Sequence, residues 1–180
     1  MRDWSPIQDA IYTWASEAST YPVIWQHQNA PQPARPYIVL HIDSVNTIQG
    51  SSPDETKPND EGRKTIFFTK DFSVSVMLFG STDAVANLDN TLSTLWQSNY
   101  IDDFAQADII VLDFEDAKDV SFTEQDHWVE KAVSYINFRT SYDQTYGPDS
   151  TTKTINEANI DGKLISSQET DISLDVSISE

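Results

Sequence analysis

The chain has no cysteine, and this absence excludes several kinds of chemistry at once. Disulfide bonds, thiolate zinc sites and cysteine nucleophiles all require at least one cysteine side chain. Histidine is also scarce. His27, His41 and His127 are widely separated, and no His-x-x-x-His pair occurs that would place two imidazoles on one face of a helix. The sequence therefore predicts neither a metal site nor a histidine-based catalytic centre.

Glycine-rich motifs and long apolar segments are missing as well. The five glycines never form the Gly-x-Gly-x-x-Gly turn or the phosphate-binding loop of nucleotide enzymes, and no serine stands in a Gly-x-Ser-x-Gly turn. We therefore predict no cofactor and no catalytic residue. No run approaches the ~20 apolar residues of a membrane-spanning helix, and the N-terminus lacks the apolar stretch of a secretory signal. These absences predict a protein that is assembled in the cytoplasm and does not bind membranes.

Few basic side chains balance the acidic ones. Lys and Arg number 11 against 29 Asp and Glu, which gives a formal net charge of −18. A protein that holds DNA or anionic lipid electrostatically needs the opposite sign. Half of the net charge lies in residues 102–130, where ten acids accompany the single base Lys118. Two interpretations stay open: a hydrated, solubilising surface, or a repulsive surface that an anionic polymer passes without adhering.

Two amphipathic helices are expected. The first begins near Ser5, which is positioned as an N-cap before Pro6, and it ends before Pro22. The second covers residues 82–96. Apolar residues recur every three or four positions in both helices and should face the core, namely Ile7, Ile11, Trp14 and Ala18 in the first, and Val85, Leu88, Leu92, Leu95 and Trp96 in the second.

The rest of the compact region has the pattern of β-strands. Residues 65–79 show the clearest alternation of apolar and polar side chains. Other strands are expected at 23–28, 37–42, 108–114, 120–122 and 128–142. Because these strands adjoin without crossover helices, the predicted fold class is α+β, a mostly antiparallel sheet with two α-helices packed on one face.

The domain organisation follows from composition. Residues 1–147 are expected to form one domain, with a long loop at 43–64 that has hardly any large apolar side chain. Residues 148–180 are expected to form a β-rich C-terminal arm with a hairpin turn at Asp161-Gly162. The arm's last apolar residues alternate strictly with polar ones: Ile172, Leu174, Val176 and Ile178. A strand beyond a finished domain needs a pairing partner, so the arm should contact its own sheet or an adjacent subunit.

A proline-rich segment leads directly into the strand expected at 37–42. It reads Asn29-Ala30-Pro31-Gln32-Pro33-Ala34-Arg35-Pro36-Tyr37-Ile38-Val39-Leu40, and its prolines hold the chain extended. This Ala-Pro-x-Pro-x-x-Pro-Tyr pattern, after an amphipathic helix and a short strand, resembles the tail or neck terminator proteins of tailed bacteriophages. The order of the later elements is similar too, so the resemblance covers about residues 4–146.

The resemblance implies a structural virion protein rather than an enzyme. Such a protein would form a ring, expected to be a hexamer, that caps the tail tube and joins it to the head. The implied partners are further copies of the chain, the tail tube protein, the head-tail connector or stopper and, in a contractile tail, the sheath protein. DNA would pass through the ring without specific binding, and the implied location is the neck of the virion.

Within this interpretation, three groups of residues are candidates for function. Pro31, Pro33, Pro36 and Tyr37 should fix the path of the chain into its strand. The lumen of the ring should be lined by acids from one of two segments, either Asp54, Glu55, Asp60 and Glu61, or Asp113, Glu115, Asp116 and Asp119. The third group is the alternating residues of the C-terminal arm.

Two other classes of function stay open. An acidic, β-rich carbohydrate-binding or receptor-binding module could use Trp25 and Trp128 as stacking platforms. A small hydrolase could use two carboxylates of the cluster at 113–119, since glycoside hydrolysis requires such a pair about 5–10 Å apart. A solvated acidic loop is the simpler interpretation of the same residues.

Overall fold

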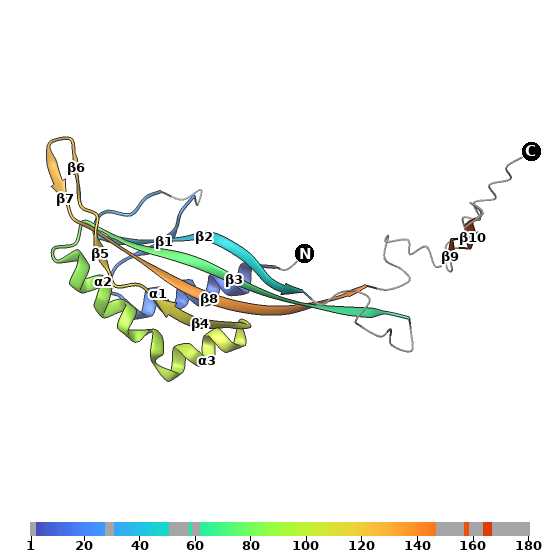
Figure 1. The fold of residues 1–180 in the computed structure, drawn as a ribbon. Coiled ribbons are helices and arrows are strands. Elements are labelled where there is room, and N and C mark those ends of the chain that lie inside the picture. The colour runs from blue at the N-terminus through green and yellow to red at the C-terminus, as the bar shows by residue number, and fades with distance from the viewer. Residues whose placement is uncertain are drawn as a thin grey trace, which may run out of the picture. The chain divides into compact units, whose positions relative to one another are not determined.

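The structure is a computed structural model that describes residues 3–27, 31–50, 58, 62–146, 157–158 and 164–166 (Figure 1). Its helices are α1 (Ser5–Ala18), α2 (Ala84–Leu92) and α3 (Ser98–Gln106), with a 3₁₀ helix η1 (Ser93–Trp96) between the last two. Its strands are β1 (Val23–Trp25), β2 (Tyr37–Gly50), β3 (Lys64–Phe79), β4 (Ile109–Phe114), β5 (Lys118–Asp119), β6 (Phe122–Glu124), β7 (His127–Val129), β8 (Lys131–Tyr146), β9 (Glu157–Ala158) and β10 (Leu164–Ser166).

One main sheet has the strand order β1-β2-β3-β8-β4, and β5 also pairs with β8. The pairs β2–β3 and β4–β8 are antiparallel, whereas β1 is parallel to β2. Strands β3 and β8 run in opposite directions, because Thr69 bonds to Ser141 while Asp71, further along β3, bonds to the earlier residue Arg139. The predicted α+β fold with a mostly antiparallel sheet is therefore confirmed.

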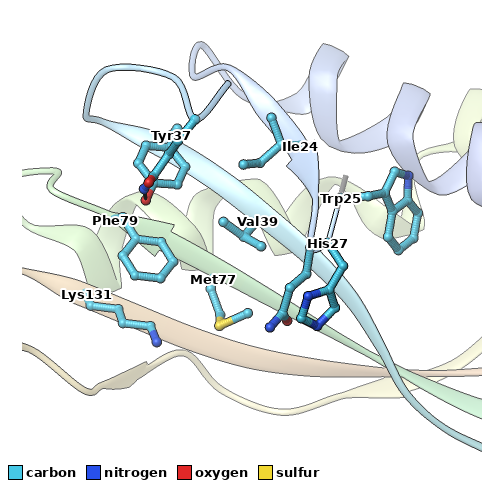
Figure 2. A pocket seen from close by; sticks show the side chains of 10 residues that line it. Ile24, Trp25, His27, Tyr37, Val39, Met77, Phe79 and Lys131 are labelled. Carbon is cyan, nitrogen blue, oxygen red and sulfur yellow. Dashed lines mark hydrogen bonds between the residues drawn. The ribbon is translucent and has the colours of Figure 1, made fainter. Parts of the chain in front are cut away.

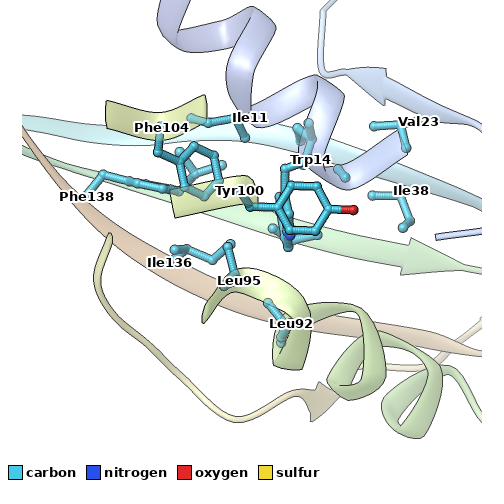
Figure 3. Close-up of a cluster of buried hydrophobic side chains, with 14 of the residues drawn as sticks. Ile11, Trp14, Val23, Ile38, Leu92, Leu95, Tyr100, Phe104, Ile136 and Phe138 are labelled. Carbon is cyan, nitrogen blue, oxygen red and sulfur yellow. The ribbon is translucent and has the colours of Figure 1, made fainter. Parts of the chain in front are cut away.

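The helices cover one face of this sheet and bury a single core against it (Figure 1). Helix α1 contributes Ile11 and Trp14, and the Trp14 Nε1–H donates a hydrogen bond of 3.0 Å to the Thr94 hydroxyl. The aromatic part of the core joins α3 to the sheet, since Tyr100 and Phe104 point from the helix toward the strands (Figure 3). We refer to the other side of the sheet, which none of the described helices covers, as the open face.

Alternation along β3 explains why the sheet has one buried face. Phe72, Val74, Val76 and Leu78 are almost fully buried, as the sequence pattern predicts for side chains that point to one face. Burial of a side chain of this size contributes about 1.5–3 kcal/mol relative to exposure. Alternate side chains of β8 point to the same buried face, and two of them, Ile136 and Phe138, are fully buried.

Three details of the predicted elements were wrong. Ser5 is the first residue of α1 rather than its cap, and the Asp3 carboxylate accepts the Ser5 N–H at 3.0 Å, which lowers the pKa of Asp3. A third helix, α3, follows the predicted second one. Trp96, expected in the core, is 51% exposed because the helix tightens to a 3₁₀ turn, where Leu95 takes the inward position.

The predicted loop at 43–64 was also wrong over part of its length. Residues 43–50 continue β2, which pairs with β3 as far as Gly50 opposite Phe68, and β3 begins at Lys64. The reason is a distant partner. Strand β3 is long enough to form backbone hydrogen bonds with these polar residues, which would not form a strand alone. Between them, Pro58, Gly62 and Arg63 are the described residues.

The chain divides into two units. The first consists of Met1–Gly50 and Phe67–Tyr142 and includes the helices and the core. The second consists of Ser51–Ile66 and Asp143–Glu180. In its described part, β9 pairs antiparallel with β10, and the hydroxyls of Thr65 and Thr145 lie 3.2 Å apart. The turn residues Asp161-Gly162 lie outside the described residues, and the boundary at residue 147 stays a prediction.

Phe138 should be among the residues that stabilise the core most. Its ring lies 5.2 Å from that of Phe72 and 5.7 Å from that of Phe104, and it has no exposed surface. We expect Phe138→Ala to lower the free energy of unfolding by about 3–5 kcal/mol. Trp128→Ala is the control, because Trp128 is 66% exposed and its loss should cost about 1 kcal/mol or less. Equal losses in denaturant titrations would contradict this assignment of the core.

Candidate assembly surfaces

The proline motif runs over the surface into β2. Pro31 is exposed and Pro33 is half-buried, while Pro36 is half-buried and follows a cis peptide bond after Arg35. Tyr37, the last residue of the motif, is 3% exposed. Its ring stacks on Phe79 at 5.2 Å, and its hydroxyl accepts a hydrogen bond from the Gln32 side-chain amide. Tyr37 therefore attaches the motif to the end of β3.

Arg35 connects the same motif to two other parts of the chain. Its guanidinium donates a hydrogen bond of 2.6 Å to Glu124 on β6, which raises the pKa of Arg35 above its ordinary value. Its side chain also lies against Gly80, which follows β3 and has a φ of +70°. A Cβ atom on Gly80 would lie 2.7 Å from the Arg35 Cβ atom. Glycine is therefore required at this position for both conformation and space.

A pocket of about 360 Å³ opens beside the motif (Figure 2). Val39, Met77 and Phe79 form its apolar floor, and His27 and Lys131 lie at its rim. The Lys131 ammonium lies 4.6 Å from the centre of the Phe79 ring. Among the described residues that line this pocket there is no carboxylate, and its cation lies over an aromatic ring.

The four acids of the turn after β4 are exposed, and three of them have local hydrogen-bond partners. Asp113 accepts a hydrogen bond of 2.6 Å from the Asn137 amide, and Glu115 pairs with Lys118. The Ser121 hydroxyl and backbone N–H donate to Asp119 and lower its pKa, which is opposite to the change that a general acid needs. Asp116 and Asp119 both line a second cavity, beside the start of α2. The hydrolase interpretation gains no support from this geometry.

The remaining candidates divide by location. Asp54, Glu55, Asp60 and Glu61, and the arm residues Ile172, Leu174, Val176 and Ile178, lie outside the described residues. Trp25 is partly buried against the core, and Trp128 stands exposed on β7. Among the described residues, no three histidine, aspartate or glutamate side chains are grouped so that they could hold a metal ion.

Two sheet edges form surfaces that the sequence interpretation missed. Strand β4 is the last strand of the main sheet, and its Ile110 and Leu112 are 54% and 36% exposed. On the opposite side, β1 pairs with residues 38–40 of β2, so within the described residues the following part of β2 is an edge. Val45 and Ile48, on that edge, are 43% and 56% exposed. The uninterrupted apolar run Ile109–Leu112 is typical of a strand covered on both faces, so the sequence has no local signal that identifies this edge.

Away from the pocket at Val39, Met77 and Phe79, the open face between these edges has a polar, charge-paired centre. Asp71 and Arg139 form a two-pronged ion pair with nitrogen–oxygen distances of 2.7 and 2.8 Å. These hydrogen bonds lower the pKa of Asp71 and raise that of Arg139. Arg139 is therefore neutralised by its neighbour, and the exposed Asp113 adds negative charge nearby through its contact with Asn137 on β8.

Comparison with known proteins identifies the family of this chain. The sequence model of a family described as phage neck terminator protein matches residues 5–167. The chain belongs to the phage neck terminator family. It is therefore a structural component of the bacteriophage neck, located in the virion, and the resemblance seen in the proline motif is confirmed. A search among curated proteins finds no match to this chain.

Membership of the neck terminator family changes how the surfaces are interpreted. A neck terminator associates with other head and tail proteins, so edges and exposed faces matter more than pockets. Among the described residues, no helix is both long enough and apolar enough to span a bilayer.

Substitution of Gly80 tests the attachment of the proline motif. We expect Gly80→Ala to lower the free energy of unfolding by about 2 kcal/mol or more, since a left-handed φ costs about 1–2 kcal/mol and the Arg35 contact adds a clash. Gly62→Ala is the matched control. Its φ is +75°, but nothing lies within 4 Å of the added Cβ, so only the conformational cost applies. Equal effects in thermal or chemical unfolding would show that the Arg35 contact is not important.

Proposed function

We propose that this neck terminator forms a hexameric ring that closes the head-proximal end of the tail tube and joins it to the connector or stopper of the head. The observation that carries the proposal is the family match over residues 5–167. Tail tube protein and connector are its partners on the two sides of the ring, and a sheath protein is a further partner if the tail contracts. DNA passes through the centre without specific binding.

Charge supports the part of the proposal that concerns DNA. A chain with a net charge of −18 repels a passing polyanion, so DNA is not retained during packaging or ejection. The open face suits the channel wall because its Arg139 is already paired with Asp71. On this face we assign Asp113 as the lumen acid. Asp116 and Asp119, which line the cavity beside α2, belong to another surface. The acids of loop 53–61 remain the alternative lining.

A phage that lacks this gene product tests the proposed function. We expect electron microscopy of lysates to show heads and tails that are complete but not joined, because the junction between them is missing. Addition of the purified chain to the lysate should restore joined particles and infectivity. Normal virions without the gene product would refute the proposal. A chain with no effect on tails in this complementation would also count against it.

We also propose that the C-terminal arm strengthens contacts between subunits. The support is the strict alternation of Ile172, Leu174, Val176 and Ile178, which is typical of a strand that pairs with a sheet edge. Native mass spectrometry should show that a chain ending at Gly147 forms rings less readily than the full chain. The matched control replaces the four apolar residues by serine in the full-length chain and should have the same effect. Unchanged ring formation by both would show that the arm is dispensable.

A further inference from the structure

The two free edges of the main sheet point to the contact between subunits. We propose that β4 of one copy pairs with residues 44–47 of β2 in the next copy, so that the sheets of neighbouring subunits join into one continuous sheet around the ring. This inference rests on the ring proposed above and specifies how the ring is held together.

The two edges lie at the same position along the strands. Val45 on β2 pairs with Phe72 on β3, and the Phe72 ring stacks on Phe138 of β8. Phe138 in turn pairs with Val111 on β4. One row of side chains therefore crosses four strands from edge to edge on the helix-covered face. A neighbouring copy placed edge to edge would continue this row, with its own Val45 beside Val111.

The open face shows a second row at the next position. Asn46 pairs with Asp71, and Asp71 bonds to Arg139. Arg139 pairs with Ile110 on β4. Both rows thus end on β2 and β4. The four strands are therefore aligned with one another at the place where both edges of the sheet are unpaired. Edge-to-edge pairing at this position requires no shift of one copy along the strands.

Both edges are available for pairing in the part of the chain that the structure describes. There, β4 pairs with β8 alone, and β2 beyond Leu40 pairs with β3 alone. Residues 43–48 are all exposed, as are Ile110, Leu112 and Asp113. An edge strand with unpaired backbone groups and exposed apolar side chains is a template for another strand. Burial of Ile110 would remove a large apolar side chain from water.

The strand directions fit a ring. Strands β2 and β8 run one way, and β3 and β4 run the other way. A rotation about an axis along the strands preserves these directions, so β4 of one copy meets β2 of the next in antiparallel orientation. Neighbouring strands therefore alternate in direction across every contact between copies, as they do within one copy. Because the contact joins two different edges, it repeats from copy to copy and ends only when the ring closes.

Charge disfavours pairing of β4 with itself. Asp113 lies on β4, and Asp108 and Glu115 flank it, so two β4 strands side by side would bring acids together. Residues 44–47 of β2 are Ser, Val, Asn and Thr and carry no charge. Asp43 is the one acid that flanks this segment, so the β4–β2 contact has less repulsion than two β4 strands would have. Irregularities between Ile42 and Ser44, between Thr47 and Gln49, and between Val111 and Asp113 leave short regular stretches, so we expect about four residues to pair on each strand.

Cysteine pairs can test this contact without background, since the chain contains no cysteine. Two full-length double variants place one cysteine on each edge of the open face: Ser44→Cys with Ile110→Cys, and Asn46→Cys with Ile110→Cys. Two are needed because the strands of neighbouring copies can be offset by one pair of residues. Mild oxidation should convert one of the two variants into a ladder of disulfide-linked species, from dimer up to the size of the ring, that a reductant removes.

Three controls make the result specific. The variant Val85→Cys with Ile110→Cys replaces the β2 cysteine by one on α2, at a position 36% exposed, and should give no ladder. Each single-cysteine variant should stay uncrosslinked alone, whereas the Asn46→Cys or Ser44→Cys chain mixed with the Ile110→Cys chain should give dimers only. Dimers from Ile110→Cys alone would indicate that β4 pairs with itself and would overturn the proposal.

Native mass spectrometry on the same samples distinguishes failure of the proposed ring from failure of the proposed β4–β2 contact. A ring mass without a ladder from either double variant would overturn the edge contact and leave the ring standing. A monomeric mass without a ladder would overturn both. A ladder that stops at the size of the ring supports both.

Discussion

The pairing of β3 with β8 is the contact on which the rest of the structure depends. On the helix-covered face it brings Phe72 against Phe138, and Phe104 of α3 packs on the same ring. On the open face it pairs Asp71 with Arg139. Each outer strand is then added to this central pair, β2 alongside β3 and β4 alongside β8. Loss of this pairing would separate the core and both edges at once.

A sheet covered by helices on one face only has two properties that suit a structural neck protein. Its open face can have polar side chains because the core is buried on the other face. Here the cation Arg139 on the open face is neutralised by Asp71. Its edges remain free, since within the described residues no helix or loop pairs with β4 or with residues 44–47 of β2. Enzymes usually have a pocket with converging polar groups, whereas Asp113, Glu115 and Asp119 are each held by a local partner.

Local pattern was enough to predict much of this fold. The alternation from Phe72 to Leu78 predicted a one-sided strand, and the spacing of Ile7, Ile11 and Trp14 predicted α1. The parts that were missed depend on distant partners. Residues 43–50 are strand because β3 is long enough to pair with them, and α3 is stabilised by Tyr100 and Phe104 against strands that are remote in sequence. The free edges could not be predicted because strand order is invisible in a periodic pattern.

The central claim is that this protein acts by assembly at the neck, through sheet edges, rather than by chemistry. A cryo-electron microscopy reconstruction of the neck in intact virions tests it most directly. The account predicts a closed six-fold ring of this chain at the end of the tail tube, with β4 of each copy within hydrogen-bonding distance of β2 in the next and the open faces toward the DNA. A neck in which the chain is absent, or a ring in which helices rather than sheet edges form the subunit contacts, would contradict it.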